Sequence, residues 1–546
     1  MELNISHIDI AVILLFVVGI IWWALKNRKN GNASEYFLAG KSQNWFVVGS
    51  SLFAASVSSS TLMGHSGEGF ISGVAVFNYN VGAIFVIIFV SLFFLPFYIK
   101  SGIYTIPEYL GRRFDNRSRK YFSFITIIGN VFLDAGAALY TGSLILKIIF
   151  PEVDMMWIII GMALMAGTYT IIGGLSSAIN ADMIQSVILI AGSVLLSVFC
   201  FNSVGGWDNF VNHFHDGVWL NLIRSNTDTT VPWFSIFLSI PILGFYFWGN
   251  NQVMVQRVMS AKTVNEGRLG FLFVAFLYVF TLFIFITPGM VGRMIDLFGV
   301  GDTLPNEIID GNTLRTQYGI DTNEVYPRLI LKLLPVGLIG VMIACMVSAL
   351  TSTLSATLSS VSTLFTMDFY KSWRPNSSPK HLVRVGQWTS FIALAIAVAW
   401  APLIGKFASL VAYYQEFSSY LAPPIVGTFL VGLFWKGSTR NGAFAGLMSG
   451  LAMSALIMIY KFGFGGEISF HFLLWVPILL VLSVLVNVVV SKCDKTEQHD
   501  IEAYTWDKTV WQTDTQELKS VPWYKNFRYI SIALIIIALL EYWWFF

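Results

Sequence analysis

Long apolar segments recur from one end of the chain to the other, and polar residues collect in the loops between them. Runs of about 18 or more apolar residues are typical of transmembrane helices. A β-barrel would instead show segments of about 10 residues in which apolar and polar positions alternate, and that pattern does not dominate here. The sequence therefore predicts an all-α polytopic membrane protein. About fourteen transmembrane helices are expected, over 8–26, 45–65, 74–99, 121–150, 155–174, 180–203, 232–256, 269–292, 333–366, 383–404, 407–435, 441–461, 468–491 and 527–545.

The charges of the loops predict the orientation of the chain. If the N-terminus lies outside, the loops rich in Lys and Arg lie in the cytoplasm, as the positive-inside rule requires. These loops include KNRK (26–29), RRFDNRSRK (112–120) and KSWRPNSSPKHLVR (371–384), whereas the opposite loop GVGDTLPNEIIDGNT (299–313) is acidic. We therefore expect a multi-pass protein of a plasma-type membrane, specifically a bacterial inner membrane, with both termini outside.

Composition agrees with this class and excludes several others. Of the 546 residues, 55% are hydrophobic and 12% charged, whereas soluble domains carry about 25% charged residues. The longest polar stretches are too short for a soluble catalytic domain. A GxxxxGK[ST] segment for nucleotides is absent, as are HExxH and GxSxG motifs, so a primary pump and an intramembrane enzyme are both disfavoured. We expect no cofactor, no further metal site and no nucleic-acid partner; the oligomeric state stays open.

Two of the predicted spans are interrupted by residues that break helices. Residues 45–65 carry Gly49, a serine run and Gly64, and residues 232–256 carry Pro241, Gly244 and two asparagines. The two spans stand five spans apart, which is the arrangement of broken helices in the inverted repeats of transporters. The predicted organisation is an N-terminal helix and cytoplasmic linker (1–44), a ten-helix transport core (45–436, halves about 45–203 and 232–436), and three further helices (437–546) with a cytoplasmic loop at 492–526.

Hydroxyl groups are concentrated in SLFAASVSSSTLMG (51–64) and in ALTSTLSATLSSVST (349–363), both inside apolar spans. One interpretation is close helix packing, with each hydroxyl bonded to a carbonyl one turn back. The other is a cation site, in which hydroxyls and the free carbonyls of an unwound helix replace the water of a sodium ion. Pairing of a hydroxyl-rich helix with a broken one favours the cation site. A channel also lines its pore with hydroxyls, but broken helices in inverted halves favour alternating access. The hydroxyl-bearing face consists of Ser348, Ser352, Ser355, Ser359, Ser362 and Thr366.

Several motifs resemble the sodium:solute symporter family, close to its bacterial sodium/galactose branch, and the resemblance covers nearly the whole chain. It implies a core of five plus five inverted helices of the LeuT type and sodium-coupled symport of a small polar solute, with Na+ as the coupling ion and membrane lipid around it. The motifs are EYFLAGKS (35–42), GIYTIPEYLGRRF (102–114), IIGGLSS (171–177), QRVMSAK (256–262), TLFTMDFYK (363–371), QEF (415–417) and LVGLFWK (430–436).

The resemblance implies a sodium ion between the first and eighth core helices. The carbonyls of Ala54 and Val57 would come from the first of these helices. The carbonyl of Ala349 and the hydroxyls of Ser352 and Thr353 would come from the eighth.

Two further residues are implied near this ion. Asp182 matches an acid near the sodium exit route and, with Ser355, would contribute to a second cation site. Ala356 lacks the hydroxyl that a second site would use, which argues against a second ion. A plain helix-end acid at the cytoplasmic face is the alternative for Asp182.

The family's sugar pocket maps onto neutral residues in this chain. Where the galactose pattern has a glutamate and a lysine, the chain has Asn80 and Tyr278. A pocket without a fixed charge favours a sugar or polyol over a carboxylate but does not establish galactose. The mapped positions are Thr61, Asn80, Gly244, Tyr278 and Gln415, with Tyr79 as an outer lid, Trp248 beside an inner lid, and His65 and Phe247 at the outer and inner gates.

Some alternatives stay open at this level. The solute could instead be an amino acid, a carboxylate or a vitamin. Proton coupling would use Asp182, Asp134 or His65 as the carrier. Asp134 is an intramembrane acid, a class of residue that is expensive in lipid and usually functional or paired, and its role is not defined by the sequence.

Overall fold

A computed structural model describes residues 6–26, 33–215, 217–226, 228, 230–301, 304, 307–405, 410–466, 471–494, 501–519 and 521–545. In these ranges the regular structure is helical, apart from two isolated bridges that join Gln43 to Ala261 and Arg224 to Pro232. Residues 27–29 of the basic KNRK segment lie outside the described residues. The prediction of an all-helical protein is confirmed.

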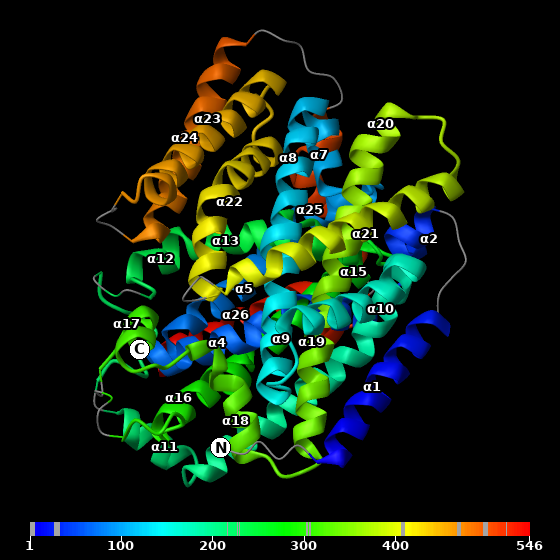
Figure 1. Ribbon diagram of the computed structural model, residues 1–546. Helices are drawn as coiled ribbons and strands as arrows, with labels where there is room; N and C mark the ends of the chain where they lie inside the picture. The colour runs from blue at the N-terminus through cyan, green and yellow to red at the C-terminus, as the bar shows by residue number, and fades with distance from the viewer. Residues whose placement is uncertain are drawn as a thin grey trace.

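The described helices run in the following order along the chain (Figure 1). In the first half they are α1 (His7–Lys26), α2 (Ala33–Leu38), α3 (Trp45–Ser56), α4 (Ser59–Ser72), α5 (Asn78–Phe93), α6 (Leu95–Lys100), α7 (Ile106–Arg113), α8 (Asn116–Ile128), α9 (Gly136–Ile149) and α10 (Met155–Ser203). The next twelve are α11 (Trp207–Phe214), α12 (Trp233–Leu238), α13 (Ile240–Phe245), α14 (Gln252–Val258), α15 (Val264–Val279), α16 (Thr287–Met294), α17 (Gly311–Gln317), α18 (Val325–Leu333), α19 (Leu338–Leu364), α20 (Lys371–Trp373), α21 (Pro379–Ile404) and α22 (Leu410–Phe434). The last four are α23 (Arg440–Met458), α24 (Trp475–Cys493), α25 (Lys508–Leu518) and α26 (Phe527–Trp544).

The number of spans differs from the prediction. Within the described residues, 11 helices are long and apolar enough to cross a membrane, or up to 12 if α15 and residues 282–294, which meet at a bend of 49°, form one span. The count of fourteen is therefore not confirmed. Two predicted spans are represented by shorter apolar helices, α3 and residues 155–168, and residues 59–93 form one continuous apolar stretch.

The helix α19 occupies the centre of the protein. In its most apolar window 89% of the residues are buried, against 17% for α1. It packs against α10, α21, α9 and α1, and Figure 1 shows α1, α10 and α19 side by side. A helix that is buried on all sides has no need of an apolar outer face. This explains why α19 tolerates a row of serines and threonines in the middle of a membrane protein.

Two core helices are interrupted, as predicted. The chain leaves α3 at Val57 (φ −100°, ψ 85°) and enters α4 at Ser58, whose backbone is extended. In the second half, α13 passes into a π-helical turn at Tyr246–Asn250, and Asn251 is extended before α14 begins. Breaks of this kind leave backbone groups without helical partners. The two breaks face a common region of the core.

A sharp kink divides α10 at Gly174 (φ 62°, ψ −158°). This left-handed backbone favours glycine. A Cβ at this position would also lie 2.5 Å from the ring of Tyr36, so the glycine allows the helix α2 to pack closely against the kink. The second part of α10 then turns back into the core, where it packs against α3 and α19.

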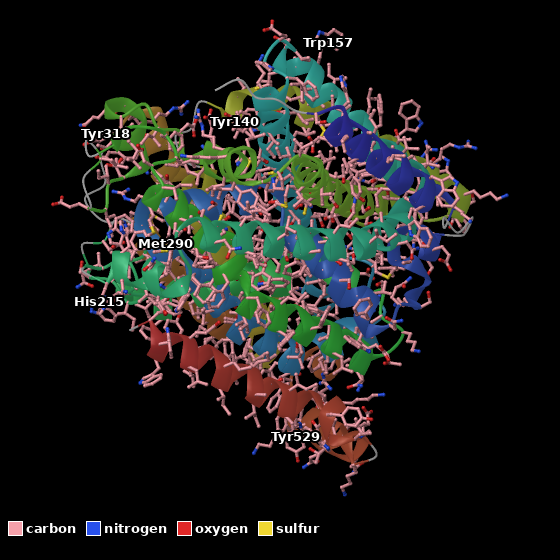
Figure 2. The ribbon with its side chains drawn as sticks, turned by 90° about the horizontal axis from the view of Figure 1, so that it is seen from below. Tyr140, Trp157, His215, Met290, Tyr318 and Tyr529 are labelled. Atoms are coloured by element: carbon pink, nitrogen blue, oxygen red, sulfur yellow. The ribbon has the colours of Figure 1, made fainter. Side chains whose placement is uncertain are left out.

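The C-terminal helices do not form a separate unit. α23 and α24 pack against α22, and α26 packs against α15 and α5 (Figure 1). Arg268 of α15 holds Asp514 of α25 through two hydrogen bonds of 2.9 and 2.7 Å. On the outer side of α26, Tyr529 is 58% exposed and points away from the bundle (Figure 2).

Candidate functional site

The break between α3 and α4 is built by a reciprocal pair of hydrogen bonds. The Ser58 hydroxyl accepts from the Thr61 N–H (3.1 Å), and the Ser58 N–H donates to the Thr61 hydroxyl (3.3 Å). This is a capping box. In a continuous helix the Ser58 N–H would donate to the carbonyl of Ala54, four residues earlier. The break therefore frees the Ala54 carbonyl from this helical hydrogen bond.

The hydroxyl-rich face of α19 is not explained by back-bonding alone. Thr351 and Thr363 donate to the carbonyls of Ser348 and Ser359, as the packing interpretation requires. Other hydroxyls on this helix are buried and have no partner among the described residues. These are Ser348, Thr353, Ser355, Thr357 and Ser359, together with Thr366 in the π-helical turn that follows the helix. Buried hydroxyls are normally hydrogen-bonded, so this face has the capacity to bind water or a cation.

The five residues expected to hold sodium lie on two helices that pack together, α3 with Val57 at its end and α19. Ala54, Val57 and Ala349 are buried. The Ser352 hydroxyl donates to Asp182 Oδ1 (2.6 Å), so its lone pairs stay available. Thr353 is 8% exposed and lines the central cavity described below. Thr353 thus belongs both to the expected ion site and to the cavity wall.

Asp182 lies at the centre of a buried ionic network. Its carboxylate accepts from the Ser51 hydroxyl (2.7 Å) and from the guanidinium of Arg257 (2.9 Å). Arg257 also donates to Ser51 (2.9 Å), and the side chains of Asp182 and Arg257 are both 0% exposed. Together with Ser352 this network joins α3, α10, α14 and α19. Sequence reasoning did not identify Arg257, although the motif QRVMSAK contains it.

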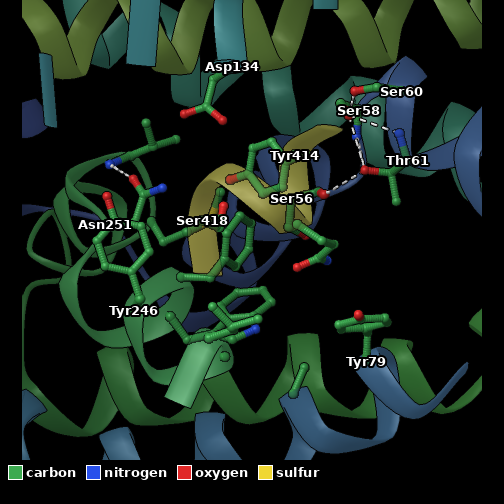
Figure 3. A pocket seen from close by; sticks show the side chains of 18 of the residues that line it. Ser56, Ser58, Ser60, Thr61, Tyr79, Asp134, Tyr246, Asn251, Tyr414 and Ser418 are labelled. Atoms are coloured by element: carbon green, nitrogen blue, oxygen red, sulfur yellow. Dashed lines mark hydrogen bonds between the residues drawn. The ribbon is translucent and has the colours of Figure 1, made fainter. Parts of the chain in front are cut away.

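A cavity of about 200 Å³ lies between the two broken helices, bounded also by α5, α9, α15, α19 and α22 (Figure 3). All of the predicted solute and gate positions line it. These are Thr61, His65, Tyr79, Asn80, Gly244, Phe247, Trp248, Tyr278 and Gln415. Additional lining residues that the sequence did not single out are Ser56, Tyr246, Asn251, Tyr414 and Ser418.

His65 and Asn80 form one polar chain on the cavity wall. His65 Nδ1 contacts the carbonyl of Thr61 (3.0 Å), and His65 Nε2 contacts Asn80 Oδ1 (3.1 Å). Asn80 then donates from Nδ2 to the Thr281 hydroxyl (2.8 Å), which donates to the carbonyl of Tyr278 (2.6 Å). The expected outer-gate histidine is therefore connected directly to a predicted solute ligand.

Aromatic rings form another part of the wall. Trp248 is buried and meets Tyr278 edge to face, with ring centroids 5.4 Å apart. Phe247 meets Trp248 in the same way at 5.1 Å. Rings of this kind pack against the apolar face of a solute, while amides and hydroxyls bond its polar groups.

One expectation about the cavity is wrong. The sequence predicted a pocket without a fixed charge, but Asp134 lines the cavity. The residue sits in a π-helical turn, Gly129–Ala135, between α8 and α9. A π-turn shifts the helical register by one residue, and such turns are frequent at functional sites. The face on which Asp134 would lie was therefore not predictable from helical spacing.

The described residues contain no group of three or more His, Cys, Asp or Glu side chains that could hold a metal ion. The ligands expected for sodium are neutral hydroxyls and carbonyls, which suit a hard monovalent cation better than a transition metal. The chemistry of the site is that of binding and release.

Comparison with known proteins agrees with this picture. The family model described as sodium:solute symporter family matches residues 36–450. The chain is 31% identical over 522 residues to sodium/glucose cotransporter 1 of Oryctolagus cuniculus. The aligned region covers 88% of this chain and 78% of that protein. The chain is also 31% identical over 545 residues to sodium/glucose cotransporter 4 of Danio rerio, covering 92% and 81%.

Two solved structures share the fold. One is the substrate-bound, outward-open state of a Na+-coupled sialic acid symporter, with a TM-score of 0.76 and 21% identity, covering 91% of this chain and 100% of that one. The other is a nucleobase-cation-symport-1 family transporter in a closed conformation, with a TM-score of 0.50 and 13% identity, covering 87% and 99%. These similarities concern the arrangement of the helices, and they confirm the predicted fold class.

Proposed function

The chain belongs to the sodium:solute symporter family, and on this premise we propose that it carries a sugar or polyol into the cell together with sodium. It is a secondary active transporter and not an enzyme. The observation that carries the proposal is that every expected solute position lines one cavity between two broken helices. Amides, hydroxyls and aromatic rings are the groups that bind a polyol. The names of the curated relatives, sodium/glucose cotransporters, support a sugar as the solute.

The proposed sodium site consists of the carbonyls of Ala54, Val57 and Ala349 and the hydroxyls of Ser352 and Thr353. Two features support it: the carbonyl released at the end of α3 and the buried, unpartnered hydroxyl of Thr353. An ion at this place ties α3 to α19. Because Thr353 also lines the cavity, ordering of this contact by sodium would organise the adjoining solute site. The binding of sodium and the binding of solute would thus be coupled through Thr353.

The buried pair of Asp182 and Arg257 is proposed as an inner latch, a contact that holds the cytoplasmic side of the transporter closed during part of the transport cycle. Ser51 and Arg257 belong to the broken helices, whereas Ser352 belongs to the central helix α19. Movement of the broken helices relative to α19 must separate these groups. Asp182 and Ser355 would then lie along the exit route of the ion, and Tyr79 would act as the outer lid.

The energy available is sufficient for accumulation. One sodium ion that moves down about 100 mV and a tenfold gradient supplies roughly 3–4 kcal/mol, which corresponds to a few-hundredfold solute gradient. Proton coupling through Asp182, Asp134 or His65 is the alternative. The membership of the family and the neutral oxygen donors around Thr353 favour sodium.

The proposed location is a plasma-type membrane, specifically a bacterial inner membrane, with both termini outside and with residues 45–436 as the transport core. The distribution of basic and acidic loops supports this orientation.

Uptake into proteoliposomes tests the function. Labelled hexoses, polyols, amino acids and carboxylates are offered with and without an inward sodium gradient. Saturable, sodium-driven uptake of a hexose or polyol is expected. Uptake that requires a proton gradient and ignores sodium would refute sodium coupling, and non-saturating efflux would indicate a channel.

A further inference from the structure

The carboxylate of Asp134 faces the solute cavity from the side of α9. Figure 3 shows it directed toward the space in which Tyr414, Ser418 and Tyr246 also lie. The π-helical turn around Asp134 places it there. A charged group in this position is expensive in a membrane protein and needs a specific counterpart.

The hydrogen-bond partner that the described residues supply for this carboxylate is neutral. With its amide oriented to match its neighbours, Asn130 donates to Asp134 Oδ2 (3.2 Å) and accepts from the Ser360 hydroxyl (2.6 Å). This neutral donor orients the carboxylate but does not neutralise its charge.

The lining of the cavity contains no compensating cation. Among the described residues that line it, there is no Lys or Arg. His65 is the one lining side chain of this described set that is able to carry a positive charge, and its ring nitrogens contact the Thr61 carbonyl and Asn80 Oδ1 rather than Asp134. The buried charge pairs of the protein lie elsewhere, as in Asp182 with Arg257. The charge of Asp134 is therefore available to a ligand.

The surroundings of Asp134 suit a cationic ligand. The same cavity is lined by six aromatic side chains, and the negative faces of such rings attract ammonium groups. A carboxylate together with aromatic rings is a combination that binds amines and repels anions. The rings are Tyr79, Tyr246, Phe247, Trp248, Tyr278 and Tyr414.

We propose that Asp134 contacts the transported solute directly and that this solute carries a protonated amine on a hydroxylated frame, as an amino sugar does. The proposal rests on the proposed sugar symport and narrows its substrate class. The ammonium group donates hydrogen bonds to Asp134. The hydroxyl groups of the solute bond the amides of Asn80 and Gln415. A sugar acid would place its carboxylate against Asp134 and be rejected.

Competition transport with three matched sugars tests this inference. Glucosamine, glucose and N-acetylglucosamine share one frame, and N-acetylation removes the charge of the amine. The variants are D134N, which keeps the shape of the side chain, and E541Q, which removes a membrane carboxyl of α26 that does not line the cavity. Uptake is measured at about pH 6.5, where the amine is protonated. Sodium dependence and thermal unfolding are recorded for each variant.

For the parent protein and E541Q, we expect half-saturation by glucosamine at a concentration at least tenfold below that of the two neutral sugars. D134N should lose at least tenfold in glucosamine affinity, and its affinity for neutral sugars and for sodium should change less than threefold. Equal loss for all three sugars, or a raised sodium requirement, would overturn the inference in favour of an ion-binding or structural role. Unchanged selectivity in D134N would overturn it as well.

Failure of the broader function is distinguishable from failure of this inference. Sodium-driven uptake of glucose without a preference for glucosamine overturns only the inference. Binding of glucosamine that depends on Asp134, measured as equilibrium binding of labelled glucosamine in detergent, would support the inference even if no sugar were taken up with sodium. Such binding without sodium-driven uptake would refute the proposed symport and leave the inference about Asp134 in place.

Discussion

Replacement of Arg257 by Gln tests the role of the buried ionic network most sharply. The guanidinium donates to Asp182 at 2.9 Å and to Ser51 at 2.9 Å, and neither charged side chain is exposed. Removal of one partner of a buried ion pair costs about 3–5 kcal/mol, because the other charge is left unpaired. If the network exists only when the inner side is closed, a loss of about 3 kcal/mol changes the ratio of closed to open states by about 150-fold.

The matched variants are D182N and the double variant D182N/R257Q. Each single variant leaves one uncompensated charge, whereas the double variant leaves none. We therefore expect the double variant to be less perturbed than the sum of the two single variants. Double-mutant coupling of this kind is the signature of a direct pair.

The assay is the accessibility of a cysteine placed at Ser359, on the side of α19 that the loop charges assign to the cytoplasm. The background lacks the native cysteines, and a membrane-impermeant maleimide is added to inside-out vesicles without sodium. Labelling should be slow in the parent protein, fast in R257Q and in D182N, and intermediate in the double variant. Strictly additive effects, or labelling rates equal to that of the parent, would refute the latch.

Three other substitutions test the remaining sites. T353A should raise the sodium concentration for half-maximal uptake by roughly 5- to 30-fold, since it removes one ion ligand and its buried hydroxyl; an unchanged sodium dependence would exclude the site. Q415A should weaken solute affinity about 5- to 10-fold and leave sodium affinity unchanged in binding assays, and the reverse order would argue against solute contact. Tyr542 donates to Asn78 Oδ1 (3.0 Å), next to the lid residue Tyr79, so Y542F should lower solute affinity by about fivefold. Y529F, on the exposed side of the same helix, is the control, and an equal effect of both would exclude a role in positioning the lid.

The breaks in the core helices were predictable because their causes are local. The serines and glycines near Val57 and the prolines, glycines and asparagines near Asn251 cannot support a continuous helix. The hydroxyl face of α19 follows from helical spacing alone. The positions that resemblance to the family implies for the solute all line one cavity, and their role in binding stays a prediction.

Other features depend on contacts that the sequence does not display. Asp182 and Arg257 are 75 residues apart, and their pairing arises only when α10 turns at Gly174. Asp134 reaches the cavity through a π-helical turn, which no periodicity reveals. The count of fourteen spans is not confirmed, since α3 is shorter than a span and residues 59–93 form one continuous apolar stretch.

The packing of the last helix against the core was also not predictable. Residues 532–540 of α26 are all apolar, so their sequence does not indicate which face meets α5 and α15. One long-range pair in this contact is Tyr542 of α26 with Asn78 of α5. Asn78 precedes Tyr79, which lines the solute cavity.

The coupling of the two fluxes is tested most directly by sodium movement driven by the solute. In proteoliposomes with equal sodium on both sides and a clamped membrane potential, an inward gradient of the transported sugar should drive radioactive sodium inward, because coupling between two sites is reciprocal. The sodium concentration is chosen so that it saturates the parent protein but not T353A. Under this condition the T353A variant should lose the sodium uptake. Movement of the sugar down its gradient without any net movement of sodium would contradict sodium-coupled symport.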